Sequence, residues 1–318
     1  MLTKPLEVRI IGAGGNWTGI SSRISLGLSG YYSRLPKGST VAAIGADPAE
    51  VCYEGIIRVA NGTEHMSITT PAWFARLALK GMYPFEKPLP LRALAGFRHD
   101  DRMAFAVKRS LGIKSLKEIR DNKIPLKVST APPGSWHPAY WGASQILKEY
   151  GFSFEDIVSW GGKLLADRPR FINDPNAKMI SDDFDAVFDE ALMTRRWKKL
   201  TDEHDLVFLP IEDDVMQRLE AKGWERSTIA KGRFRGVDED VPAADYSGWL
   251  LFCREDMDDE LAYLTIAALE EQQKDIQNLF PQPFAAMTGP ADLKTISSNL
   301  PIPLHPGAER YYREKGAL

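Results

Sequence analysis

The chain has 318 residues, of which 44% are hydrophobic and 26% charged, and its net charge at pH 7 is −3. This length and composition predict a globular protein with room for two domains of ordinary size. The slight negative charge argues against general binding to nucleic acid or anionic membrane. The sequence also lacks an apolar run of the ~18 residues that a transmembrane helix needs.

The first residues, Met1-Leu-Thr-Lys-Pro-Leu-Glu7, lead directly into a predicted strand, so we expect no signal peptide in this chain. An extracytoplasmic protein would have had a leader removed, whereas a cytoplasmic protein needs none. The two cysteines, Cys52 and Cys253, are expected to be buried free thiols rather than a disulfide pair.

Strands and helices alternate along the first hundred residues. Apolar, β-branched runs predict strands at 8–11, 39–44, 65–69, 91–97 and 103–107. Helices are predicted at 17–28 and 50–60, and Asn61-Gly62 ends the second one. Such alternation predicts a parallel sheet with helices on both faces.

The pattern then starts again. Ser115 is expected to cap a short helix to Arg120, with Glu118 completing a capping box. Later strands are predicted at 126–130, 185–188, 206–209 and 246–253, and later helices at 140–150, 213–222 and 258–279.

This second run of strands and helices predicts two Rossmann-like α/β lobes. The chain is expected to cross near 98–104 and to return near 241–247. Lobe 1 would then be discontinuous, with residues 1–98 plus 247–318, and lobe 2 would contain residues 99–246. Two crossing strands form a hinge, so we expect the ligand in the cleft between the lobes.

The C-terminal segment reads Pro301-Ile-Pro-Leu-His-Pro-Gly-Ala-Glu-Arg310-Tyr-Tyr-Arg-Glu-Lys-Gly316, and Pro306-Gly307 is expected to open a short amphipathic helix. The order of residues in this segment resembles the C-terminal signature of the TAXI family, the solute receptors of certain TRAP transporters. The resemblance implies the type II periplasmic-binding-protein fold and a periplasmic location. It also implies membrane permease subunits as partners. The ligand is expected to be a small organic acid, because Arg195 and two helix N-termini, near Gly14 and Ser135, together favour a carboxylate.

The first candidate site is the glycine-rich turn Gly12-Ala-Gly-Gly-Asn-Trp17. A dinucleotide fingerprint needs a third glycine where Trp17 stands, which argues against nicotinamide binding. A glycine-rich turn at a helix N-terminus still presents backbone N–H groups to an anion. The family has a turn facing the ligand here, which implies contacts from Gly14, Asn16 and Trp17. Alternatively, the glycines only form the turn.

The second candidate site is Ala131-Pro-Pro-Gly-Ser-Trp-His137, which resembles the family's Ala-Pro-Gly-Ser segment with one extra proline. Ser135 is expected to cap the next helix and to offer its hydroxyl or N–H to a carboxylate. Trp136 would stack on the ligand. A cap without a ligand and a core tryptophan are the alternatives.

The third candidate site follows Asp185-Ala-Val-Phe188, which matches the family's Asp-Ala-hydrophobic-Phe strand. Glu190 suits an amino or hydroxyl group on the ligand, and Arg195 suits a ligand carboxylate through a bidentate pair. The alternative is an internal ion pair on the surface, Glu190 with Arg195 or Asp189 with Arg196. Thr70 follows the third strand, where the family often has glutamine, and Thr70 and Trp73 are expected to take over the contacts.

No common catalytic motif is present, and the five histidines show no metal-ligand spacing, so we expect neither metal nor cofactor. The sequence therefore favours a binding protein. A cytoplasmic enzyme on the same bilobal fold, a decarboxylase or another lyase, is the alternative. The charged side chains after residue 188 and the missing leader favour that alternative.

Overall fold

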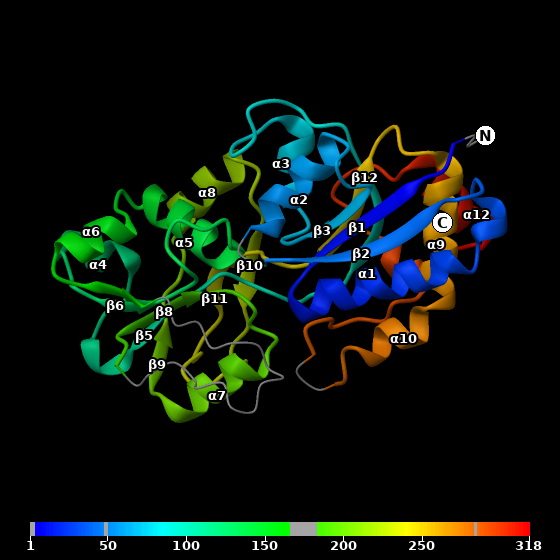
Figure 1. Cartoon of the computed structure of the whole chain (residues 1–318). Coiled ribbons are helices and arrows are strands. Elements are labelled where there is room, and N and C mark those ends of the chain that lie inside the picture. The colour runs from blue at the N-terminus through cyan, green and yellow to red at the C-terminus, as the bar shows by residue number, and fades with distance from the viewer. Residues whose placement is uncertain (1–3, 48–49, 166–182, 283–284) are drawn as a thin grey trace. The chain divides into compact units, whose positions relative to one another are not determined.

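The computed structural model describes residues 4–47, 50–165, 183–282 and 285–318. It divides into two compact units, which Figure 1 shows in one cartoon. Unit 1 contains Met1–His99 and Ser247–Leu318, and unit 2 contains Asp100–Tyr246. Each unit is built around its own sheet and its own core.

The sheet of unit 1 has the strand order β2-β1-β3-β12-β4. These strands are β1 (Glu7–Ala13), β2 (Thr40–Ala46), β3 (Met66–Thr69), β4 (Leu91–Phe97) and β12 (Trp249–Arg254). β1 runs parallel to β2 and β3, whereas β12 runs antiparallel to β3 and β4. A strand from the C-terminal part of the chain thus lies inside the sheet.

The sheet of unit 2 has the equivalent order β7-β6-β8-β5-β9. Its strands are β5 (Ala104–Lys108), β6 (Lys127–Ser129), β7 (Lys163–Leu165), β8 (Ala186–Asp189) and β9 (Leu206–Phe208). β5, the first strand after the crossing, runs antiparallel to β8 and β9, as β12 does in unit 1. A separate antiparallel pair is formed by β10 (Arg226–Ile229) and β11 (Val241–Ala244).

Both sheets therefore repeat one topology, and the predicted α/β class with a periplasmic-binding-protein fold is confirmed. The expectation of wholly parallel sheets is wrong. Each sheet is mixed. The first strand after the chain passes from one unit to the other, β5 in unit 2 and β12 in unit 1, runs antiparallel to its neighbours.

The helices of unit 1 are α1 (Gly14–Ser29), α2 (Val51–Ala60), α3 (Phe74–Lys80), α9 (Asp259–Glu271), α10 (Gln273–Asn278), α11 (Leu293–Ile296) and α12 (Pro306–Glu314). α1 packs closely on α9, since a Cβ on Gly27 would lie 2.7 Å from the Cβ of Ala268. The single helix expected at 258–279 is interrupted at Gln272, where φ is −90° and ψ is 6°.

The helices of unit 2 are α4 (Leu116–Asp121), α5 (Pro138–Glu149), α6 (Phe154–Ser159), α7 (Arg195–Glu203) and α8 (Asp213–Ala221). Val187, Trp197 and Phe208 are among the residues of its core. No helix in the described part of the chain has the length and apolar character needed to cross a bilayer.

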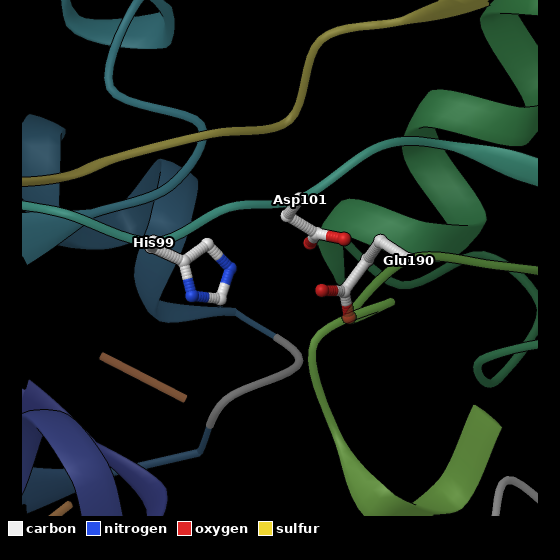
Figure 2. A group of neighbouring side chains, drawn as sticks. All are labelled: His99, Asp101 and Glu190. Carbon is white, nitrogen blue, oxygen red and sulfur yellow. The ribbon is translucent and has the colours of Figure 1, made fainter. Parts of the chain in front are cut away.

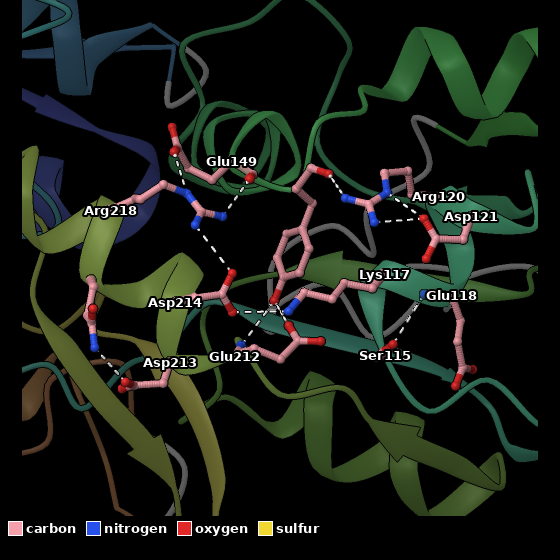
Figure 3. A network of polar contacts seen from close by, with 12 residues as sticks. Ser115, Lys117, Glu118, Arg120, Asp121, Glu149, Glu212, Asp213, Asp214 and Arg218 are labelled. Atoms are coloured by element: carbon pink, nitrogen blue, oxygen red, sulfur yellow. Dashed lines mark hydrogen bonds and ion pairs between the residues drawn. The ribbon is translucent and has the colours of Figure 1, made fainter.

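A polar network connects α4, the end of α5 and the start of α8 (Figure 3). Arg218 donates to the backbone carbonyl of Glu149 at 3.0 Å and pairs with Asp214 at 3.3 Å. Lys117 approaches the same Asp214 carboxylate at 3.0 Å. Because these side chains are largely exposed, the pairs contribute little to stability, and the network mainly aligns the three helices.

Candidate functional site

In unit 1, two predicted site segments lie at one edge of the sheet. Gly14, Asn16 and Trp17 follow β1, and Thr70 follows β3. β1 and β3 are parallel neighbours, with Ile11 opposite Ser67. Their carboxyl ends therefore meet, and this is the edge at which open α/β sheets bind ligands.

The N-terminus of α1 has no side-chain cap. The helix begins at Gly14, which has φ of 52°, directly after Ala13 at the end of β1. Its first turn contains no acidic residue, and its N-cap residue, Ala13, has no polar side chain that could cap it. The first N–H groups of α1 and the positive end of its dipole are thus presented at the sheet edge, an arrangement that favours an anion.

The side chains of this edge differ in their surroundings. Trp17 belongs to the core of unit 1, with its ring edge-on to Trp249 at a centroid distance of 6.1 Å. Asn16 is half-buried in the first turn of α1. The hydroxyl of Thr70 donates to the carbonyl of Gly248 at 3.2 Å. Trp17 thus has a clear packing role.

In unit 2, the other two predicted segments also share an edge. β6 and β8 are parallel neighbours, with Ser129 opposite Val187. The segments that follow them, 130–137 and 190–194, therefore begin side by side at the carboxyl ends of these strands.

The segment after β6 differs from expectation at the helix cap. α5 begins at Pro138, and His137 caps it by accepting from the N–H of Ala139 at 3.1 Å. The hydroxyl of Ser135 instead donates to the carbonyl of Pro132 at 2.7 Å. The predicted Ser135 cap is wrong because Pro138 occupies the first helical position, which leaves Ser135 in the preceding turn.

Two further residues of this segment bear on the site. Trp136 is half-buried. Thr130, which the sequence analysis missed, is buried, and its hydroxyl has no hydrogen-bond partner among the described residues. Nothing in the sequence separates Thr130 from any other threonine at a strand end.

The segment after β8 contains a buried ion pair. Asp189 Oδ2 lies 2.8 Å from Arg196 Nη2, with 2% and 11% of the two side chains exposed. The carbonyl of Glu190 accepts from Trp197 Nε1 at 2.8 Å and from Arg196 at 2.7 Å. Of the two ion pairs considered, the one between Asp189 and Arg196 is present, and it is buried rather than at the surface.

Arg195 is exposed and is the first residue of α7. Within the described residues, the N-cap residue of α7, Thr194, does not cap the helix with its side chain, and the first turn contains no acidic residue. The hydroxyl of Thr194 at the cap position donates to the carbonyl of Ala191 at 2.8 Å. The edge of unit 2 therefore offers a positive helix end with an arginine on it.

A second carboxylate lies near Glu190. Asp101 is fully buried, and its carboxylate and that of Glu190 place an oxygen within 4.8 Å of each other. Figure 2 shows both side chains together with His99, which ends the first of the two segments of unit 1. The sequence analysis missed Asp101, because its partners lie about ninety residues away. Carboxylates in such a group suit a donor group on an organic ligand or a hard cation.

The cysteines do not contribute reactive thiols. Cys52 and Cys253 are both buried and not joined in a disulfide, as predicted. Burial raises the pKa of the Cys253 thiol well above its ordinary value. Since the thiolate is the nucleophile, Cys253 is unreactive at neutral pH.

Comparisons with known proteins place the chain in a family. Among solved structures it is similar to iron-bound HitA from Pseudomonas aeruginosa, with 13% identity, a TM-score of 0.40, and coverage of 98% of this chain and 99% of that one. It is likewise similar to the aliphatic sulphonate binding protein SsuA from Escherichia coli, with 13% identity, a TM-score of 0.40, and coverage of 98% and 88%. A TctC solute binding protein from Polaromonas gives 14% identity, a TM-score of 0.43, and coverage of 86% of both chains.

No curated protein matches the sequence. The model of the NMT1-like family, however, matches residues 49–316, which is most of the chain. The chain therefore belongs to the NMT1-like family.

Proposed function

We propose that the protein is a solute receptor that captures a small organic acid at the strand-end segments of its two units. The observation that carries the proposal is the uncapped N-terminus of α1 at Gly14 and Gly15. Several backbone N–H groups and the helix dipole converge there, and neither the N-cap residue nor the described first turn supplies a negative charge, so a ligand carboxylate is suited to this position.

The side chains of unit 2 suggest the rest of the ligand. Arg195, exposed at the uncapped start of α7, suits a carboxylate through a bidentate pair. Glu190, next to Asp101, suits a hydroxyl or amino group. We therefore propose an acid that also carries a hydrogen-bond donor, such as a hydroxy or amino acid. Ser135, Trp136, Thr70 and Asn16 complete the proposed set of contacts.

The proposed partner is a membrane permease of the TRAP type, and the proposed location is extracytoplasmic. The family assignment supports the general role, and the C-terminal segment that resembles TAXI receptors supports the finer one.

A negatively charged substitution at Gly15 tests the proposed anion site. A Cβ at this position would meet nothing within 4 Å, so both G15A and G15D are expected to fold. We expect G15D to weaken binding of an acid at least about tenfold, since repulsion of about 1.4 kcal/mol suffices for this. The same aspartate complements the helix dipole, so the stability of the free protein should stay equal or rise. Calorimetry with acetate, succinate, malate, glutamate and benzoate measures the affinities, and choline serves as a cationic comparison.

G15A is the matched control and should bind the acid nearly as wild type does. If G15D binds the acid as tightly as G15A, the carboxylate does not lie at α1. If choline binds and none of the acids does, the proposed ligand class is wrong.

A second candidate function is an enzyme, and the buried carboxylates of Asp101 and Glu190 favour it. Two neighbouring carboxyl groups with different surroundings are able to act as acid and base. NMR spectra of each acid after long incubation with the protein distinguish the functions. A receptor returns the acid unchanged, whereas a decarboxylase or lyase yields new signals.

A further inference from the structure

The carboxylate of Asp101 binds three backbone N–H groups. Oδ1 accepts from the N–H of Arg102 at 2.7 Å and from that of Leu192 at 2.8 Å, and Oδ2 accepts from the N–H of Ala191 at 2.8 Å. Asp101 precedes β5, whereas Ala191 and Leu192 follow β8. One buried side chain thus joins the segment that enters unit 2 to the turn after β8.

That turn has an unfavourable backbone conformation. Ala191 has φ of 67°, in the left-handed region that a residue with a Cβ rarely adopts. The conformation persists only where surrounding contacts enforce it. Both oxygens of Asp101 contact this turn, one at Ala191 and one at the next residue. Charge-assisted hydrogen bonds from backbone N–H groups are the stronger kind, so they are suited to this task.

The turn determines where two proposed ligand contacts point. Glu190 lies immediately before Ala191, and Arg195 begins α7 four residues after it. The backbone carbonyl of Glu190 is held by Trp197 and Arg196 on the α7 side. Asp101 holds the opposite side of the same turn.

We infer that Asp101 is a positioning residue: its carboxylate fixes the left-handed turn at Ala191 and so presents Glu190 and the start of α7 to the ligand. The inference rests on the proposed function only for its ligand. The structural claim, that one carboxylate determines this turn, is independent of which solute binds. Because Asp101 is the second residue of unit 2, the binding turn is also tied directly to the crossing segment.

Hydrogen exchange of the unliganded protein, followed by NMR, tests the structural claim. D101N replaces one acceptor oxygen with an N–H₂ group, which conflicts with a backbone donor. We expect the amides of Ala191 and Leu192 to exchange at least about tenfold faster, which corresponds to about 1.4 kcal/mol. D101E keeps the charge but displaces the oxygens, and it should have an effect in the same direction.

The matched control is D185N at the opposite end of β8. Asp185 also accepts from a backbone N–H, that of Lys127 at 2.8 Å. D185N should speed exchange at Lys127 and leave Ala191 and Leu192 unchanged. Unchanged exchange at Ala191 and Leu192 in both Asp101 variants would overturn the inference.

Binding of malate, glutamate, succinate and benzoate supplies a second measurement. For the acids that bind the wild-type protein, D101N should lower the binding affinity by about tenfold or more. In an A191G background the loss should be clearly smaller, because glycine adopts a positive φ without penalty. An equal loss in both backgrounds would show that Asp101 acts by another route. If no acid binds wild type, the proposed function fails, while the exchange experiment still decides the role of Asp101.

Discussion

Two adjacent arginines at the start of α7 have different environments. Arg195 is exposed, whereas Arg196 is mostly buried and pairs with Asp189. Removing one partner of a buried ion pair leaves the other charge uncompensated, which is more damaging than loss of an exposed pair.

We expect R196A to destabilise unit 2 by about 3–5 kcal/mol. R195A is the matched control, and an exposed position of this kind should change the stability by no more than about 0.5 kcal/mol. Urea denaturation followed by circular dichroism measures both values.

R195A should instead weaken binding of the acid, about thirtyfold or more if a buried charged contact worth 2–5 kcal/mol is lost. A large loss of stability in R195A, or none in R196A, would contradict this division.

The sequence located this region but not the roles of its residues. The match at Asp185-Ala-Val-Phe188 predicts a buried strand and a polar turn after it, and both are present. Which arginine faces inward depends on where α7 begins, since one residue rotates a helix by about 100°. Asp101 was not predictable, because its acceptor role depends on backbone donors brought beside it by the sheet.

At the scale of elements, the C-terminal segment has a structural role. His305 caps α12 by accepting from the N–H of Gly307 at 3.2 Å. A Cβ on Gly307 would lie 2.0 Å from the carbonyl oxygen of Asp259, so only glycine allows α12 to approach α9. The hydroxyl of Tyr312 donates to the carbonyl of Leu94 in β4 at 2.9 Å. The segment that carries the family resemblance thus reports on the fold of unit 1 rather than on the ligand.

The His305 cap makes the stability of unit 1 depend on pH. His305 is fully buried, and burial lowers its pKa below the ordinary value, although the nearby Asp259 carboxylate acts in the opposite direction. The folded state therefore holds His305 neutral where the unfolded chain already binds a proton. Stability is highest above the unfolded pKa of about 6.5 and falls as the pH decreases below it. Protonation also removes the acceptor that Gly307 uses.

We expect H305N to reduce this pH dependence, because asparagine caps helices well and does not titrate. Each proton taken up only by the unfolded state contributes a slope of about 1.4 kcal/mol per pH unit. Urea midpoints between about pH 5 and pH 8 give the slopes of both proteins. Burial also lowers the pKa of His65, so some dependence should remain in H305N. Equal slopes in H305N and wild type would show that the cap does not titrate as argued.

At this scale, the sequence predicted which segments form strands and helices better than it predicted their pairing. The run 91–97 forms β4 with the predicted limits, since a buried apolar strand is visible in composition alone. The antiparallel orientation of β5 and β12 depends on where the chain passes from one unit to the other. Local preferences along the sequence do not contain that information.

At the scale of the whole molecule, two segments connect the units, at residues 99–103 and 244–248. The backbone hydrogen bonds of these segments belong to unit 1 at one end and to unit 2 at the other. On the side of unit 1, the N–H of Gly248 donates to the carbonyl of His99 at 2.9 Å. On the side of unit 2, the N–H of Tyr246 donates to the backbone carbonyl of Asp101 at 3.1 Å, and the N–H of Met103 donates to the carbonyl of Ala244 at 3.0 Å. The two ends of unit 2 are thus paired with each other inside the unit.

This arrangement predicts that unit 2 folds as an isolated fragment of residues 100–246. All five strands of its sheet come from this range, and its ends are already joined through Met103 and Ala244. The fragment 1–99 should not fold, because β12, which lies between β3 and β4, comes from Trp249–Arg254. Without β12, β4 is separated from the sheet, and β3 keeps β1 as its partner but exposes one unpaired edge. Thermal unfolding followed by circular dichroism should show a cooperative transition for 100–246 and none for 1–99. A cooperative transition in 1–99 would mean that the sheet of unit 1 forms without its inner antiparallel strand, β12.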